Sequence, residues 1–177
     1  MQERALRIAK RLMWTGTLVA LGALVAALVS GPGYHIHDIT TDTDHPPQFV
    51  ALLPVRQKSP NGPEYGGEKI AREQRAAYPD IQPVLLPEPP ARAFERVLAA
   101  ARSRGWEIVA AVPAEGRIEA TDTTRWFRFK DDIVIRVTPD VSGSRIDVRS
   151  KSRLGRSDLG TNARRIRNFF TALNSSR

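Results

Sequence analysis

Residues 106–151 read WEIVAAVPAEGRIEATDTTRWFRFKDDIVIRVTPDVSGSRIDVRSK, and this stretch decides the fold. Apolar and polar side chains alternate along it, as in strands that bury one face and expose the other. Short turn sequences interrupt the alternation after residues 112, 129 and 141. Consecutive strands joined by short turns predict a four-stranded antiparallel meander.

The second strand, expected over residues 117–129, changes its apolar parity. Ile118 and Ala120 occupy even positions, whereas Phe127 and Phe129 occupy odd ones. A β-bulge near residues 125–126 would produce this shift. Residues 130–132 (KDD) are then expected to form the turn into the third strand.

Two amphipathic helices flank the meander. Residues 91–104 place apolar side chains at helical spacing, and Gly105 ends that helix. A last helix is expected to begin near Asp158, which can cap it. Its apolar stripe is Ala163, Ile166, Phe169, Phe170 and Leu173. The fold class is therefore α+β, a two-layer sandwich with both helices on one face of the sheet.

Residues 34–90 hold most of the thirteen prolines of the chain and show little periodicity. A weak helix is expected from Gly66-Gly67 to Ala77, followed by an extended piece over residues 81–86. Apolar residues such as Phe49 and Leu52 need burial. We interpret this region as an extended, Pro-rich arm that wraps the domain of residues 91–177.

Residues 12–30 are nineteen consecutive residues without a charge. A helix of this length covers about 28 Å, close to the hydrocarbon thickness of a bilayer. Four basic residues precede it, which predicts a cytoplasmic N-terminus. Residues 1–33 are thus expected to be a cytoplasmic stub and a single-pass anchor in a bacterial inner membrane, with the rest periplasmic. A cleavable signal peptide is the alternative, but a cut after Ser30 would put Leu28 where a small residue is needed.

The net charge of +8 is unevenly distributed. Residues 32–90 carry five bases against eight acids, whereas residues 91–177 carry eighteen bases against ten acids. A basic surface suggests an anionic partner such as anionic lipid, glycan or an acidic envelope protein. Nucleic acid is not expected on the outer side of the membrane. The chain has no cysteine, which excludes disulfides and thiol chemistry.

The candidate binding residues are basic and lie on two features. One is the sheet face that the helices leave open, and the other is the polar loop that leads into the last helix, where N–H groups and bases could hold an anion. The candidates are Arg125, Arg136, Arg149, Arg153, Arg156 and Ser157. The alternatives are a salt-bridged solvent face and an Asp158 side chain that itself occupies the N–H groups.

Catalytic residues are not assigned. The three histidines all lie within residues 35–45, so no Ser–His pairing is supported. His35, His37 and Asp38 have the chemistry of a metal site, but a polar stalk explains them as well. The adjacent pair Asp131-Asp132 is explained by its expected turn position. We therefore assign no metal and no cofactor.

The sequence resembles the bacterial family catalogued as domain of unknown function 1499. The matching pieces are residues 38–41 (DITT), 46–47 (PP), 78–83 (YPDIQP), 105–108 (GWEI), 116–121 (GRIEAT), 129–132 (FKDD), 147–150 (DVRS) and 155–160 (GRSDLG). The resemblance implies an envelope-associated or lipoprotein-like domain without a settled activity. It supplies no catalytic residues.

These observations favour a non-catalytic binding or structural module, anchored in the membrane, for an anionic ligand or partner. One alternative is an envelope assembly factor that acts by protein–protein contact, and another is a metal-assisted hydrolase. The sequence leaves open the ligand, the partner, the oligomeric state and whether the anchor is cleaved. It also leaves open whether residues 34–90 cover the open face of the sheet.

Overall fold

The structure is a computed structural model that describes residues 36–124 and 127–175. The expected anchor over residues 12–30 and the expected bulge at residues 125–126 lie outside this part of the chain. Within it, no helix has both the length and the apolar character needed to cross a bilayer.

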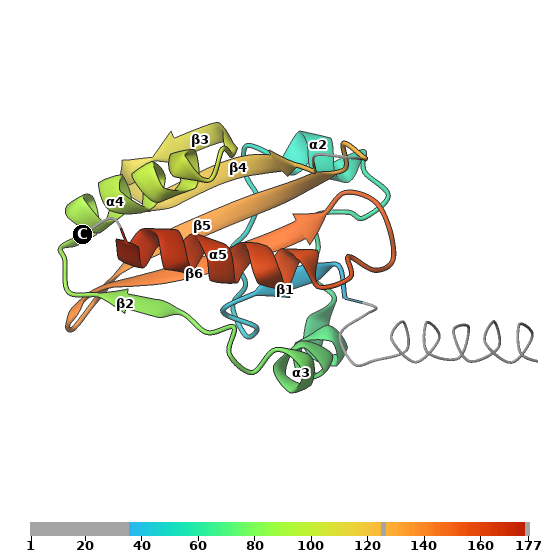
Figure 1. Cartoon of the computed structure of the whole chain (residues 1–177), viewed down its shortest axis with the longest axis horizontal. Coiled ribbons are helices and arrows are strands. Elements are labelled where there is room, and N and C mark those ends of the chain that lie inside the picture. The colour runs from blue at the N-terminus through green and yellow to red at the C-terminus, as the bar shows by residue number, and fades with distance from the viewer. Residues whose placement is uncertain (1–35, 125–126, 176–177) are drawn as a thin grey trace, which may run out of the picture.

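A six-stranded sheet forms one layer, and two helices cover one of its faces (Figure 1). The strands are β1 (Asp38–Thr40), β2 (Val84–Leu86), β3 (Glu107–Val112), β4 (Arg117–Thr123), β5 (Lys130–Asp140) and β6 (Gly143–Ser152). The helices are α2 (Leu53–Gln57), α3 (Gly67–Ala77), α4 (Pro90–Ser103) and α5 (Thr161–Ser175), and Pro113–Glu115 form a 3-10 turn, η1. The strand order is β1-β6-β5-β4-β3, with β2 also beside β6, and each described pairing is antiparallel.

The α+β class is as expected, but the sheet has two strands more than the predicted meander. Both additional strands come from the arm and pair with the outer edge of β6. Ile39 of β1 lies opposite Ser150, and Leu85 of β2 lies opposite Arg145. Each strand is only three residues long, too short for alternation to assign its pairing. The expected extended piece over residues 81–86 contains β2, whereas β1 was not expected.

The predicted turn at residues 130–132 was wrong. These residues begin β5, where Asp131 pairs with Ser152 and Asp132 with Lys151 of β6. The chain instead turns after β4, where the Thr124 N–H donates to the Phe129 carbonyl at 2.9 Å. Charged residues are tolerated inside the strand because each aspartate finds a cationic partner, as described below.

The main core lies between the sheet and helices α4 and α5. The expected stripe of α5 is buried at Ala163, Ile166, Phe169 and Leu173, and Phe169 stacks on Trp106 with ring centroids 5.3 Å apart. The predicted cap is present as well, because the Asp158 carboxylate accepts the N–H groups of Gly160 and Asn162 at 2.9 and 2.7 Å.

The opposite face of the sheet is covered by part of residues 34–90, a point that the sequence left open. Residues 41–66, including α2, lie across β4, β5 and β6 (Figure 1). Phe49 and Leu52 of the arm form a second apolar cluster with Val134 of β5. The domain therefore has three layers over these strands, and the arm is part of the fold.

A substitution at Gly116 would test how tightly the chain after η1 packs on β5. Its φ is +60°, and a Cβ there would lie 2.1 Å from the Val137 carbonyl oxygen. Gly105 has a similar φ of +75° but open space around a Cβ. We expect Gly105→Ala to cost about 1–2 kcal/mol from the left-handed backbone alone. Gly116→Ala should cost about 1–3 kcal/mol more because of the clash. Urea unfolding of both variants measures the difference, and equal losses would contradict this packing.

Candidate functional site

Alternation along the three long strands sends every second side chain toward the arm, and most of these side chains are charged. They are buried or half-buried beneath residues 41–66, and together with their partners from β1 and α2 we call them the charged layer. Its members are Asp38, Arg56, Arg117, Glu119, Asp132, Arg149, Lys151 and Arg153. A buried charge is costly unless it is paired and hydrogen-bonded, so the partners decide what this layer can do.

Arg149 is wholly buried and fastens the arm to the sheet. Its Nε and Nη2 donate to the two carboxylate oxygens of Asp38, at 2.9 and 2.8 Å. The same guanidinium donates to the carbonyl oxygens of Pro47 and Pro63, at 3.2 and 2.9 Å. It also lies over the ring of Phe49, 5.0 Å from the centroid. All of these partners are internal, so the side chain is not available to a ligand.

A second buried cluster joins α2 to β5. Arg56 Nη1 donates to Asp132 Oδ2 at 3.3 Å, and Arg56 Nη2 donates to the Asn61 carbonyl at 2.7 Å. The other oxygen of Asp132 accepts from Arg153 Nη2 at 2.7 Å and from the Thr121 hydroxyl at 2.9 Å. Both oxygens of this carboxylate are therefore occupied.

Glu119 fixes the entry into α2. Its carboxylate accepts the N–H groups of Val50, Ala51 and Leu52, at distances from 2.8 to 3.1 Å. Arg117 donates to the same carboxylate. Every hydrogen-bonding direction of Glu119 thus points at the protein itself, which gives this residue a structural role.

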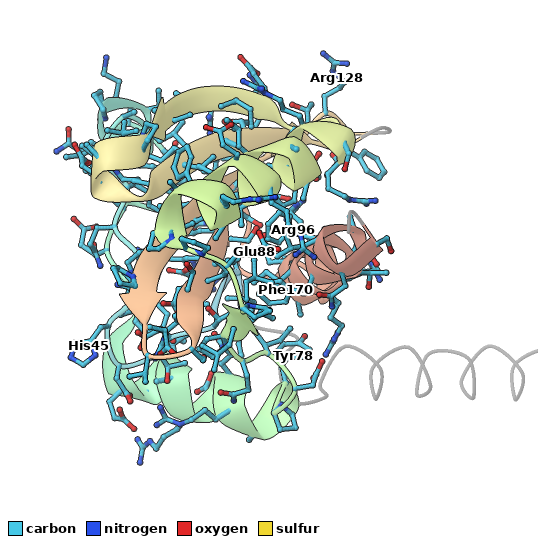
Figure 2. All side chains as sticks on the ribbon, turned by 90° about the vertical axis from the view of Figure 1, so that its left-hand side faces the viewer. His45, Tyr78, Glu88, Arg96, Arg128 and Phe170 are labelled. Carbon is cyan, nitrogen blue, oxygen red and sulfur yellow. The ribbon has the colours of Figure 1, made fainter. Side chains whose placement is uncertain are left out.

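The outer rim of the same face carries two arginines that share two aspartates. Arg136 donates to Asp42 and Asp147 at 2.9 and 3.1 Å, and Arg145 donates to the same pair at 3.2 and 3.0 Å. The hydrogen bond from Arg145 to Asp147 raises the pKa of the guanidinium. This rim closes the charged layer toward solvent, and Figure 2 shows His45, beside it, projecting from the domain.

Asp131 and Asp132 cannot act as a catalytic pair. Successive strand residues point to opposite faces, so Asp132 lies in the charged layer and Asp131 lies on the helix side. There Asp131 accepts from Arg165 of α5 at 2.5 Å, and Arg165 also donates to Asp122 at 2.8 Å. The two aspartates therefore lie in a strand and not in the turn that we expected.

The six predicted binding residues have different surroundings. Arg125 lies outside the described residues, and the side chains of Arg136, Arg149 and Arg153 have the internal partners given above. Arg156 and Ser157 lie in the loop between β6 and α5, where Arg156 is exposed. The Ser157 hydroxyl accepts the N–H of Leu159 at 3.3 Å.

A cavity of about 150 Å³ lies between the start of β1 and residues 64–70 of the arm and is lined by His37, Asp38, Glu64 and Lys151, among others. Burial lowers the pKa of Lys151, although Asp38 at 3.2 Å opposes this shift. The His37 Nδ1 atom is buried without a hydrogen-bond partner in the described part of the chain. No group of three His, Asp or Glu residues suited to a metal occurs in that part, and His35 lies outside it.

Two larger cavities lie away from the charged layer. One, of about 1000 Å³, separates β2 from α4, and the Glu88–Arg96 ion pair lies at its edge (Figure 2). The other, of about 390 Å³, lies between residues 41–44 and α3 and is lined by polar groups that include Asp42 and Arg75. Among the described residues, no Ser, Thr or Tyr lines the larger cavity. In the smaller one the Thr41 hydroxyl donates to Asp147 and the Thr43 hydroxyl accepts from Arg75, so both are engaged in internal hydrogen bonds.

One end of the domain exposes large apolar side chains together with bases. Phe127 is 78% exposed, Leu159 62%, and Phe129 and Leu154 51% each. Arg128, Lys130 and Arg156 lie on the same loops and are exposed as well. We call these seven residues the basic apolar end. Arg128 points away from the body of the domain in Figure 2.

The sequence placed Phe127 and Phe129 on a strand and so missed this surface. The parity change after Ala120 was the available signal, because it indicates that the regular strand does not continue to Phe129, and β4 ends at Thr123. Gly155 and Gly160, on either side of Leu159, indicated a loop there, but nothing in the sequence places that loop beside the turn after β4.

Removing the carboxylate of Asp38 should destabilise the domain strongly. Asp38→Asn leaves Arg149 and Lys151 buried without their counter-charge, and we expect a loss of about 3–5 kcal/mol in the free energy of unfolding. Asp80→Asn is the matched control, because its partner Arg167 lies at 2.6 Å in an exposed pair. The control should lose less than about 1 kcal/mol. Urea unfolding measures both, and similar losses would mean that the charged layer does not hold the arm.

The stability of the domain should depend on pH through His37. Burial and the nearby Lys151 hold the pKa of His37 below its usual value of 6.5, against the opposing charge of Asp38. Between the lowered pKa and 6.5 the unfolded chain therefore binds more protons than the folded one. The free energy of unfolding should fall as the pH drops through this window, and His37→Gln should lose that part of the slope. Parallel pH profiles of the two proteins would contradict this.

Comparison with known proteins identifies the family of this chain but assigns no activity to it. No curated protein matches the sequence. The crystal structure of protein CV1439 from Chromobacterium violaceum is similar over 52% of this chain and 92% of its own, at 14% identity. Its TM-score of 0.39 is too low to carry an argument about fold or function. Residues 38–173 match the family described as protein of unknown function DUF1499, and the chain belongs to that family.

Proposed function

We propose that this protein is a non-catalytic binding module of the bacterial envelope, tethered to the inner membrane by residues 12–30. In this proposal the basic apolar end, and not the sheet face, contacts an anionic ligand or partner. The observation that carries the proposal is the exposure of four large apolar side chains beside three bases on one surface.

The bases of this surface support an external partner. Arg128, Lys130 and Arg156 form no ion pair with any carboxylate in the described part of the chain, whereas most of the sheet arginines do. Contiguous apolar side chains exposed beside polar ones mark interaction sites in soluble domains. An anionic partner with an apolar component would satisfy both kinds of side chain.

Backbone strain on the same surface supports a functional role. Arg128 and Leu159 have φ values of +55° and +53°, and they are the only non-glycine residues with positive φ among those described. A left-handed conformation costs about 1–2 kcal/mol for such a residue, and glycine would avoid the cost. Strain of this kind clusters at functional sites, where a particular side chain is needed.

The contacts within the charged layer support a non-catalytic function. The carboxylates of Asp132 and Glu119 accept from internal donors. Asp38 lines the cavity of about 150 Å³ beside Lys151, but it is ion-paired with that lysine at 3.2 Å and with Arg149 at 2.8 Å. The charges of the layer are thus used to fasten the arm. Tethering is supported by the uncharged run of residues 12–30 and by the bases before it, and it remains a proposal.

Co-purification tests the proposal. The full-length protein is extracted in mild detergent and captured, and bound lipid, protein and metal are identified by mass spectrometry. The double variant Arg128→Glu with Arg156→Glu should lose about tenfold or more of the bound species, since each reversal replaces attraction to an anion by repulsion. Arg72→Glu with Arg92→Glu makes the same charge change at two exposed arginines outside the basic apolar end, and it should retain binding.

Two outcomes would contradict the proposal. Equal loss in both double variants would indicate a non-specific effect of net charge. A stoichiometric metal that is lost on His37→Ala would instead favour the metal-assisted hydrolase.

A further inference from the structure

We infer that the basic apolar end rests on the anionic surface of the same bilayer that anchors the chain, with its apolar side chains in the headgroup region. This inference rests on the proposed function and names the partner. It also fixes the orientation of the domain, because it places the ends of β4 and β6 toward the membrane.

The described chain begins at this end of the domain. The His37 carbonyl accepts the N–H of Ser152 at 2.9 Å and the side-chain amide of Asn162 at 3.1 Å. The backbone of Arg156 also acts on the His37 side chain, where it opposes the lowering of the pKa, so the two residues lie close together. Residue 37 therefore lies beside the loop that carries Leu154, Arg156 and Leu159.

The second loop of the basic apolar end lies next to the first. The Arg153 N–H donates to the Lys130 carbonyl at 3.1 Å, which continues the pairing of β6 with β5. This contact sets the turn after β4 beside the loop after β6. Figure 1 shows both loops and the start of β1 on the right-hand side of the domain, with the β5–β6 turn on the left.

Chain length limits how far this end can lie from the membrane. Ile36 follows Ser30, the last residue of the expected anchor, by six positions in the chain. A chain spans at most about 3.6 Å per residue, so the connection reaches at most about 22 Å. A domain tethered this closely by its basic apolar end meets the bilayer with that end at a very high effective concentration.

The chemistry of the surface fits a bilayer better than a small ligand. None of the three cavities described above is lined by a residue of the basic apolar end. These three cavities, which could enclose a small molecule, are therefore not part of this surface. Phe127 and Phe129 stack with centroids 5.7 Å apart, and aromatic and leucine side chains of this kind enter the interfacial region of a bilayer. Arg128, Lys130 and Arg156 complement anionic headgroups around them.

Single-cysteine labelling of the full-length protein tests the inference. The native chain has no cysteine, so Phe129→Cys carries the only label. Val141→Cys is the matched control, because Val141 is an exposed apolar residue in the β5–β6 turn at the other end of the same sheet. Each protein, with an environment-sensitive fluorophore, is reconstituted into phosphatidylcholine vesicles with or without phosphatidylglycerol.

The expected result is specific to position and to lipid. In vesicles with phosphatidylglycerol, the label at residue 129 should shift its emission to the blue. Its quenching by aqueous iodide should fall about threefold or more relative to the label at residue 141. Adding Arg128→Glu and Arg156→Glu should abolish the difference. Equal quenching at both positions in these vesicles would overturn the inference.

The variant Leu159→Gly distinguishes an effect of this residue on membrane binding from an effect on folding. Glycine relieves the positive φ of this residue, so the Tm should stay unchanged or rise. If Leu159 serves the membrane contact, the protection of the label at residue 129 should nevertheless decrease. A lower Tm with unchanged protection would show that Leu159 serves the fold, and this would contradict its assigned role.

The two proposals fail in different ways. If a protein co-purifies and is lost in the Arg128→Glu, Arg156→Glu variant while the label at residue 129 stays exposed, the binding module stands and the bilayer contact falls. If the label is protected only after that protein is added, the partner is a protein. If neither co-purification nor labelling responds to these substitutions, both proposals fall.

Discussion

The structure depends on the buried pair of Arg149 and Asp38. Arg149 belongs to the central strand β6 and Asp38 to the first strand of the arm, so this bidentate contact joins the two parts of the chain. The carbonyl groups of Pro47 and Pro63 accept the other hydrogen bonds of the Arg149 guanidinium. Moving a charge from water into the protein interior costs several kcal/mol, and only a complete set of hydrogen-bonding partners such as this one offsets that cost. The arm is therefore specified by polar geometry as much as by apolar burial.

This constraint changes how the basic composition of residues 91–177 is understood. A net charge of +8 in that segment suggested a positively charged sheet face. In the folded domain, Arg136, Arg149 and Arg153 are instead neutralised by aspartates, two of which, Asp38 and Asp42, come from the acidic arm. The opposite charges of the two segments thus serve assembly of the fold. In the described part of the chain Arg128, Lys130 and Arg156 have no such counter-charge, and our proposal assigns recognition to the end of the domain that carries them.

Much of the fold could be predicted because its signals are local. The apolar stripes of α4 and α5, the cap at Asp158 and the helix from Gly67 to Ala77 all follow from side-chain spacing and backbone preference within one element. The turn at residues 130–132 was predicted wrongly because charged residues usually mark turns. Here Asp131 and Asp132 lie within a strand, since Arg165 and Arg56 from distant segments pair with them.

The sequence by itself determined the α+β class, the core faces of the helices and the meander, because the 3.6- and 2-residue periods are properties of single elements. Only the tertiary structure decided that β1 and β2 complete the sheet and that residues 41–66 cover its second face. It also decided that the loops of Phe129 and Leu159 meet. These features depend on contacts between residues that are far apart in the chain. The type of one residue in such a contact does not show which distant residue it meets. The binding surface that we propose therefore lies at the end of the domain that carries Arg156, which the sequence had also indicated, and not on the sheet face, where Arg136 and Arg149 are paired.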